Sequence, residues 1–386
     1  MPSPVVEITP EELAESPPDL LLDVREPAEY ARGRIPDARL VPLGRLEREV
    51  PSLTPPPGGR IVLYCEVGQR SAVGARLLAA LGYRHVRSLA GGIERWAAEG
   101  RPVVRPAGLV GEQWERYDRH LRLAEIGVEG QRRLLAARVL VVGAGGLGSP
   151  AALYLAAAGV GTIGIVDDDR VECSNLQRQI LHGSSDLGLP KVVSATERIR
   201  DLNPDVQVVA HGVRLDADNA ETLLAGYEVV VDGSDNLPTR YVLNDAAARR
   251  RLPVVHGAIH RFEGQVTVFR PGVGPCYRCL FPEPPPPETA PSCAELGVVG
   301  AMPGVVGSLQ ALETLKLLLG IGDPLVGRLL CFDALGAASF EVRIRPDPTC
   351  PVCGATAGSD REGAVGTDRD RDRRVDAVAS GETTGG

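Results

Sequence analysis

The chain has 386 residues, enough for two or three domains of ordinary size, and 44 % of them are apolar. Only 4 % are aromatic, so Ala, Val and Leu must supply most of the core. The 42 basic and 50 acidic side chains give a net charge of −8. This excludes broad electrostatic attraction to nucleic acid or to an anionic membrane, because both attract basic surfaces.

One apolar stretch has the length of a membrane span. Residues 139–166 carry no charge, but they include seven glycines and Pro150, and Asp167 follows directly. This composition predicts a strand, a turn, a helix and a strand rather than a lipid-facing helix. The N-terminus shows no signal-peptide pattern. We therefore expect a cytoplasmic protein whose eight cysteines are metal ligands, nucleophiles or core residues rather than disulfides.

Residues 1–100 predict a small parallel α/β domain. Apolar runs typical of buried strands lie at residues 20–23 and 61–65. Stretches of helical character follow at residues 71–81 and 93–98. Residues 101–112 have the proline and glycine content of a linker.

Residues 113–355 predict a second, larger α/β domain. It contains a strand–helix–strand unit whose strands lie at residues 138–142 and 162–167. Three further strands are predicted at residues 228–232, 253–256 and 265–269, and the last of them is antiparallel. We expect a mobile proline-rich loop at 282–291. The last segment, 360–386, has twelve charged residues and no aromatic, which predicts a disordered tail.

A glycine-rich turn of the form G-x-G-x-x-G follows the first strand of this domain and precedes its helix. It contains Gly143, Gly145, Gly146 and Gly148, and Asp167 ends the next strand. Glycines let the backbone approach a phosphate at a helix N-terminus, and the carboxylate can accept from ribose hydroxyls. The alternative is a purely structural turn. By itself the motif indicates NAD or FAD.

Further polar segments favour a triphosphate with Mg²⁺ over a dinucleotide. They are SNLQRQ at 174–179, GLPK at 188–191 and DGSDN at 232–236. The block resembles the E1-like adenylyltransferases of the MoeB/ThiF/Uba4 family, through these segments and RYDRHLRLAEIG, VLVVGAGGLGSPAALYLAAAGVG, EGQVTVF and CYRCL. The resemblance implies a Rossmann-like fold and ATP as substrate. The implied nucleotide and Mg²⁺ contacts include Gly146, Asp167, Asn175, Arg178, Lys191, Asp235 and Asn236. Arg119 resembles an arginine that reaches the neighbouring subunit's phosphates, which implies a homodimer.

Two C-x₂-C pairs, Cys276/Cys279 and Cys350/Cys353, can together complete a closed tetrahedral zinc site. The long separation between the pairs means that the metal would join a C-terminal segment to the domain. A redox-active pair is the alternative. The family resemblance agrees with structural zinc.

Cys65 ends a predicted strand, and the segment CEVGQRS leads into a helix. Loop N–H groups, the helix dipole and Arg70 all favour a thiolate at this place, although a buried structural cysteine is the alternative. The domain resembles the rhodanese sulfurtransferases through LLDVREPAEYARGRIPDA, YCEVGQRSA and LAGGIERW. The resemblance implies a persulfide on Cys65. Glu66 and Arg34 depart from the usual residues, and both affect the choice of sulfur donor. Known fusions have the rhodanese domain at the C-terminus, not at the N-terminus as here.

Cys293 follows the proline-rich loop and matches the family cysteine implicated in a covalent bond to the carrier; an incidental loop cysteine is the alternative. Cys173 and Cys331 are predicted to be packing residues beside strands. The six histidines form no recognisable metal or catalytic pattern. We interpret Gly385-Gly386 as a chance resemblance to a carrier tail.

Together the resemblances imply ATP-dependent adenylylation of the C-terminal Gly-Gly of a small β-grasp sulfur carrier of the MoaD/ThiS type. Sulfur from the Cys65 persulfide then gives a thiocarboxylate, and the persulfide donor is a cysteine desulfurase or thiosulfate. One alternative is a related enzyme for tRNA thiolation or cysteine biosynthesis. Another is a non-catalytic zinc scaffold. The molybdopterin, thiamine and tRNA thiolation pathways all remain open.

Overall fold

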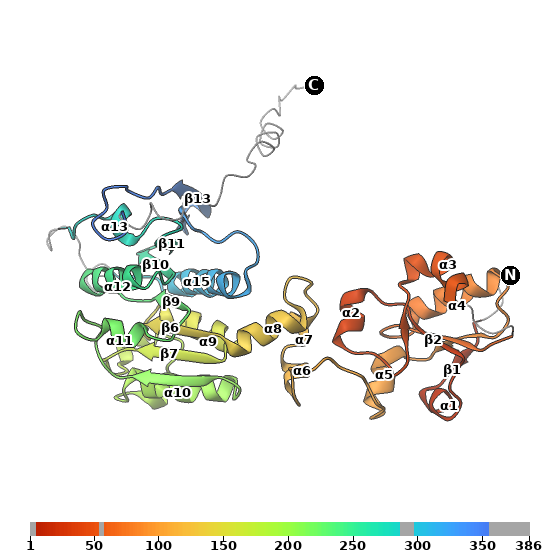
Figure 1. The fold of residues 1–386 in the computed structure, drawn as a ribbon. Coiled ribbons are helices and arrows are strands. Elements are labelled where there is room, and N and C mark those ends of the chain that lie inside the picture. The colour runs from red at the N-terminus through yellow and green to blue at the C-terminus, as the bar shows by residue number, and fades with distance from the viewer. Residues whose placement is uncertain (1–4, 54–57, 286–296, 355–386) are drawn as a thin grey trace, which may run out of the picture. The chain divides into compact units, whose positions relative to one another are not determined.

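The computed structural model describes residues 5–53, 58–285 and 297–354. The chain divides into two compact units, residues 1–136 and 137–386 (Figure 1). No helix within the described ranges is both long and apolar enough to span a bilayer. The predicted tail at 360–386, Cys293 and most of the predicted mobile loop lie outside the described residues.

The first unit is built on a five-stranded, wholly parallel sheet of order β1-β5-β4-β2-β3. Its strands are β1 (Glu7–Ile8), β2 (Leu20–Asp23), β3 (Arg39–Leu40), β4 (Ile61–Tyr64) and β5 (Val86–Leu89). The helices are α1 (Pro10–Glu15), α2 (Pro27–Arg32), α3 (Leu46–Glu49), α4 (Gln69–Ala80), α5 (Gly92–Ala98), α6 (Gln113–Arg116), α7 (Asp118–Leu121) and α8 (Gly127–Ala136).

Both faces of this sheet are covered, which explains the uninterrupted apolar strands in the sequence. Leu22 and Leu63 pack on one face with Leu78 of α4. Helices α1 and α5 lie on the other face (Figure 1). Leu21 and Val62 belong to the core on that face, together with apolar side chains of these helices, Trp96 among them. The parallel α/β class predicted for this unit is confirmed.

The second unit has an eight-stranded sheet of order β13-β12-β11-β10-β9-β6-β7-β8, parallel from β10 to β8 and antiparallel from β10 to β13. The strands are β6 (Arg138–Val142), β7 (Thr162–Val166), β8 (Gln207–His211), β9 (Val229–Asp232), β10 (Val254–His260), β11 (Glu263–Phe269), β12 (Arg328–Asp333) and β13 (Ala338–Arg343). The helices are α9 (Gly148–Ala157), α10 (Lys191–Leu202), α11 (Ala220–Leu224), α12 (Leu237–Arg249), α13 (Tyr277–Leu280) and α15 (Ala301–Leu319).

Helices cover both faces of the parallel part of this sheet, as in Rossmann-like domains. Val230 belongs to the core that includes α11 and α12, whereas the adjacent Val229 packs with residues of α15. The chain leaves β6 toward β7 and later returns to β9 on the other side of β6, so the strand order reverses between β6 and β9. Ligands bind at such a reversal, beyond the carboxyl ends of the strands.

The predicted strands and helices are found within a few residues of their expected bounds, and β11 is antiparallel as expected. Helices α6 to α8 group with the first compact unit, so the units divide at residue 136 rather than at the predicted linker 101–112. The domain boundaries from the sequence stay a prediction. One prediction is wrong: Cys173 is exposed, at the start of a short 3-10 turn, and does not pack in the core, while Cys331 is buried.

Candidate functional site

Cys65 lies directly after β4, where the chain turns into α4. The turn requires Gly68, which has a φ of +97° and precedes the first residue of the helix. The Gly68 N–H donates to Cys65 Sγ at 3.2 Å, and Ser71 Oγ lies 3.6 Å from the same sulfur. The sulfur therefore receives donors at a helix N-terminus, an arrangement that stabilises a thiolate or a persulfide anion.

The start of α5 fixes the backbone of the same loop. Ile93 N–H donates to the Cys65 carbonyl at 2.9 Å, and Glu94 N–H donates to the Glu66 carbonyl at 3.1 Å. Gly92 must be glycine, because its φ is +60° and a Cβ there would overlap the Cys65 carbonyl oxygen. The segment LAGGIERW thus positions the sulfur loop through its glycines and its free helix N–H groups.

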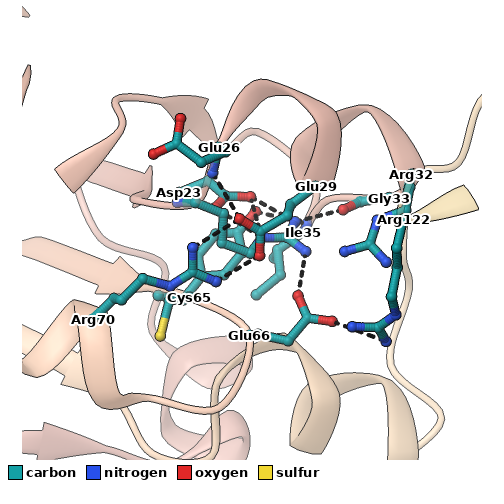
Figure 2. Close-up of polar contacts among 12 residues, drawn as sticks. Asp23, Glu26, Glu29, Arg32, Gly33, Ile35, Cys65, Glu66, Arg70 and Arg122 are labelled. Atoms are coloured by element: carbon teal, nitrogen blue, oxygen red, sulfur yellow. Dashed lines mark hydrogen bonds and ion pairs between the residues drawn. The ribbon is translucent and has the colours of Figure 1, made fainter. Parts of the chain in front are cut away.

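Arg70 is not a free cation beside the thiol. Its Nη1 and Nη2 donate to the two carboxylate oxygens of Glu29 at 2.7 and 2.5 Å (Figure 2). Burial would raise the pKa of Glu29, but the hydrogen bonds from Arg70 and from the Glu26 N–H, with the charge of Arg70, outweigh it and lower that pKa to about 2. Arg70 is therefore held close to Cys65 with its charge largely balanced.

Glu66, the second residue of the loop, has a similar set of partners. Arg25 Nη1 donates to Glu66 at 2.9 Å, and Arg122 Nη2 lies 4.0 Å from its other carboxylate oxygen (Figure 2). Arg25 also pairs with the buried Asp23 at 2.7 Å. Burial opposes the charge of Arg25, but the bonds to Asp23 and Glu66 prevail and raise its pKa. The Glu66 carboxylate thus tethers the loop to two arginines.

The glycine-rich turn lies at the strand-order reversal, between the ends of β6 and β9. Gly143 has a φ of +92°, and a Cβ there would lie 2.8 Å from the Gly233 carbonyl oxygen, in the segment after β9. A Cβ on Gly148 would overlap the Gly143 carbonyl oxygen. These glycines allow the close backbone approach that a phosphate-binding turn needs.

Polar segments predicted from the sequence converge on this turn. Asp167 accepts from Ala144 N–H at 2.8 Å, and burial raises the pKa of Asp167. Lys191, only 5 % exposed, donates to Asp169 at 2.8 Å. A Cβ on Gly146 would lie 3.7 Å from Arg178 Cδ. Arg178 and Lys191 therefore lie close to the turn and to the acidic strand end, and their binding of phosphate stays a prediction.

The remaining predicted nucleotide contacts have local partners. Asn175 is buried and accepts from Glu172 N–H at 3.1 Å, while Arg178 donates to the Ser174 carbonyl at 3.0 Å. Asn236 caps α12 by accepting from Thr239 N–H, and the neighbouring Asp235 is exposed. Arg119 belongs to the first compact unit, so its role stays a prediction.

Sequence reasoning missed two residues of these sites. Glu29 neutralises Arg70 from 41 positions away, and His182 contacts Ala144 in the glycine-rich turn from 38 positions away. No spacing rule connects such distant positions. The only available signal was composition: Glu29 lies in a segment typical of rhodaneses, and His182 follows SNLQRQ by two residues.

The four predicted metal ligands gather in one cluster. Their Sγ atoms all lie within 4.8 Å of one another, with Cys276–Cys350 at 3.6 Å and Cys279–Cys353 at 3.4 Å. Tetrahedral zinc with Zn–S bonds of ~2.3 Å holds its sulfurs about 3.8 Å apart, so the cluster is consistent with zinc. Burial raises the pKa of the Cys276 thiol to about 11. A bound cation would counteract this by stabilising the thiolates.

The cysteine cluster is also joined to α12. Tyr277 N–H donates to Asn244 at 2.8 Å, and the Tyr277 ring packs edge-on against Tyr241 at 5.2 Å. Arg278 forms a two-pronged ion pair with Asp245, with both bonds at 2.8 Å. The cysteine cluster therefore supports α12, whose N-cap residue is the predicted nucleotide contact Asn236.

The fold and these sites define a rhodanese-like unit joined to a Rossmann-like nucleotide-binding unit with a four-cysteine cluster. Comparison with protein families agrees: residues 9–99 match the rhodanese-like domain and residues 117–352 match the ThiF family. The chain belongs to the ThiF family.

Similar proteins include the sulfur carrier protein adenylyltransferase of Thermus thermophilus, 55 % identical over 63 % of this chain and 92 % of that protein. The probable adenylyltransferase/sulfurtransferase MoeZ of Mycobacterium tuberculosis is 48 % identical over 69 % of this chain and 72 % of its own. Among solved structures, E. coli MccB with ATP has a TM-score of 0.55 at 20 % identity, and the match covers 68 % of this chain and 80 % of MccB. That likeness concerns the fold alone.

Proposed function

We propose that this chain is an adenylyltransferase and sulfurtransferase that activates the C-terminal Gly-Gly of a β-grasp sulfur carrier protein and supplies it with sulfur. The observation that carries the proposal is the convergence of Gly146, Asp167, Arg178 and Lys191 at the strand-order reversal, in a chain that also has the Cys65 loop. A carrier substrate also fits the names of similar proteins.

In the adenylation step, the carrier carboxylate attacks the α-phosphorus of ATP, and pyrophosphate leaves. The glycine-rich turn presents backbone N–H groups to the phosphates, while Arg178 and Lys191 balance the developing negative charge. Lys191 must exchange Asp169 for a phosphate when ATP binds. Asp235 is the proposed ligand for Mg²⁺, which when bound would neutralise phosphate charge. Arg119 of a neighbouring subunit would complete the site in a homodimer.

In the sulfur step, a donor such as a cysteine desulfurase or thiosulfate loads Cys65 with a persulfide. Its terminal sulfur attacks the acyl carbon of the adenylate, AMP leaves, and an acyl disulfide links the carrier to Cys65. A second thiol, for which Cys293 is the candidate, then attacks Cys65 Sγ and releases the thiocarboxylate. The resulting disulfide needs an external thiol reductant before the next cycle.

The experiment separates the two activities with two variants. Full-length protein is incubated with ATP, Mg²⁺, a persulfide donor and a β-grasp carrier, and the carrier is weighed by mass spectrometry. Asp235→Ala should lose carrier-dependent ATP–pyrophosphate exchange but keep sulfurtransferase activity. Cys65→Ser should still release pyrophosphate yet form no thiocarboxylate unless free sulfide is added. Thiocarboxylate formed by Cys65→Ser at the wild-type rate without sulfide would refute the sulfur step.

A further inference from the structure

The peptide group after Ala144, within the glycine-rich turn, is held by a histidine that no motif indicates. His182 is 7 % exposed, and its Nε2 lies 2.9 Å from the Ala144 carbonyl oxygen. Because a trans peptide is planar, the Gly145 N–H points opposite to that carbonyl. His182 therefore directs the Gly145 N–H away from itself, on a turn where a Cβ at Gly145 would approach only Gln179, at 3.8 Å.

The hydrogen bond fixes the tautomer of His182. A carbonyl oxygen can only accept, so Nε2 must carry the proton. Ser194 Oγ lies 2.8 Å from Nδ1, and the single proton of this hydroxyl has the Asp186 carboxylate as its acceptor, also at 2.8 Å. The contact with Ala144 therefore requires a proton on Nε2, whichever role Nδ1 takes toward Ser194.

Burial lowers the pKa of His182. The hydrogen bond to Ala144 opposes this effect and raises the pKa, the charge of Lys191 lowers it, and the charges of Asp167 and Asp186 raise it. Asp186 accepts from the Ser194 hydroxyl at 2.8 Å and from the Gly183 N–H at 2.7 Å. Asp186 and Ser194 border a cavity of about 300 Å³ beside His182.

We propose that His182 is a positioning residue for nucleotide binding: its Nε2–H orients the Ala144–Gly145 peptide so that the Gly145 N–H faces the phosphates. Together with Asp167, which accepts from the Ala144 N–H, it holds Ala144 from both sides. The inference rests on the proposed function, because it concerns the same nucleotide site.

The test compares three variants with a matched control in the full-length protein. His182→Leu removes the donor, and His182→Gln places an amide N–H near the position of Nε2. Ser194→Ala keeps the ring but removes the contact at Nδ1. The control is His211→Leu, because His211 is a half-buried histidine of the same unit whose ring contacts Tyr227 rather than the turn. Calorimetry gives the Kd for ATP, exchange assays give KM and kcat, and thermal unfolding gives Tm.

Removing one buried hydrogen bond should raise the Kd and KM for ATP about tenfold in His182→Leu, with a smaller change in kcat. His182→Gln should restore Kd and KM to within about threefold of the wild-type values, and Ser194→Ala should raise Kd about two- to threefold. The control His211→Leu should match the wild type. Wild-type ATP affinity in His182→Leu would overturn the inference. So would a Gln variant as weak as Leu, or an equal loss in the control. Absence of ATP binding by the wild type would instead refute the proposed function, and the inference with it.

Discussion

Replacing Glu29 with Gln tests whether the Arg70–Glu29 pair stabilises the sulfur loop. Gln keeps the volume of the side chain and can still accept a hydrogen bond, but it removes the charge that both Nη atoms of Arg70 contact. The Glu29 side chain is 21 % exposed and that of Arg70 is 38 % exposed. The pair is therefore only partly shielded from solvent.

The expected loss follows from the pKa of Glu29, which is lowered from 4.5 to about 2. Each pKa unit corresponds to about 1.36 kcal/mol, so the whole shift, which includes the hydrogen bond from the Glu26 N–H, sets an upper limit of roughly 3.4 kcal/mol. Since more than a third of the Arg70 side chain is exposed, solvent screening reduces the expected loss to about 1–2 kcal/mol at neutral pH.

The pH dependence gives the sharper test. A carboxyl group whose pKa is lowered by folding stabilises the protein fully above its unfolded pKa and loses this effect as pH falls through its folded pKa. The difference between wild type and Glu29→Gln should thus be constant above pH 4.5, shrink below it, and disappear below a pH of about 2.

Urea unfolding followed by tryptophan fluorescence measures this difference, because Trp96 and Trp114 both lie in the first unit. Glu47→Gln is the matched control, since Glu47 is an exposed residue of α3 with no ion pair to any described residue. Equal losses in the two variants, or a Glu29→Gln loss that does not change with pH, would refute the reasoning.

Two further predictions concern the second unit. Purified protein should contain about one zinc ion per chain. Cys350→Ser should lose the zinc and have a lower Tm. Zinc-free wild-type protein whose four thiols titrate freely would contradict the zinc assignment. Gly148→Ala should lower the free energy of unfolding by more than about 3 kcal/mol or prevent folding, because its Cβ would overlap the Gly143 carbonyl oxygen. Gly304→Ala is the control and should be tolerated, because there is open space around Gly304. Circular dichroism and thermal unfolding measure both glycine variants.

The sequence predicted those parts of the sites that are continuous along the chain. The turn at residues 143–148 and the Cys65 loop are short strand–turn–helix segments, in which glycines and a cysteine indicate the backbone path and the chemistry. The same locality explains why both C-x₂-C pairs were recognised. Their meeting was an inference from zinc chemistry, since 70 residues separate Cys279 from Cys350.

The partners of these loops could not be predicted, because they come from other elements. Arg70 was expected to favour a thiolate at Cys65, but its partner Glu29 of α2 could not be predicted. Cys173 was expected in the core because it follows a strand, but the chain leaves the sheet there in an exposed turn. Local sequence carries little information about such tertiary pairings.

The two loops share one physical requirement. Each follows a buried parallel strand, and each needs glycines to reach its conformation, but glycine also makes the unfolded loop more flexible and therefore harder to fix. In the first unit the backbone N–H groups of α5 donate to carbonyl groups of the Cys65 loop, and Arg25 donates to the Glu66 side chain of the same loop. In the second, Asp167 and His182 hold Ala144. A charged or polar group from a neighbouring element thus supplies in each case the rigidity that glycine cannot. Loss of such a partner should weaken the activity, whereas loss of Cys65 or Asp235 should abolish it.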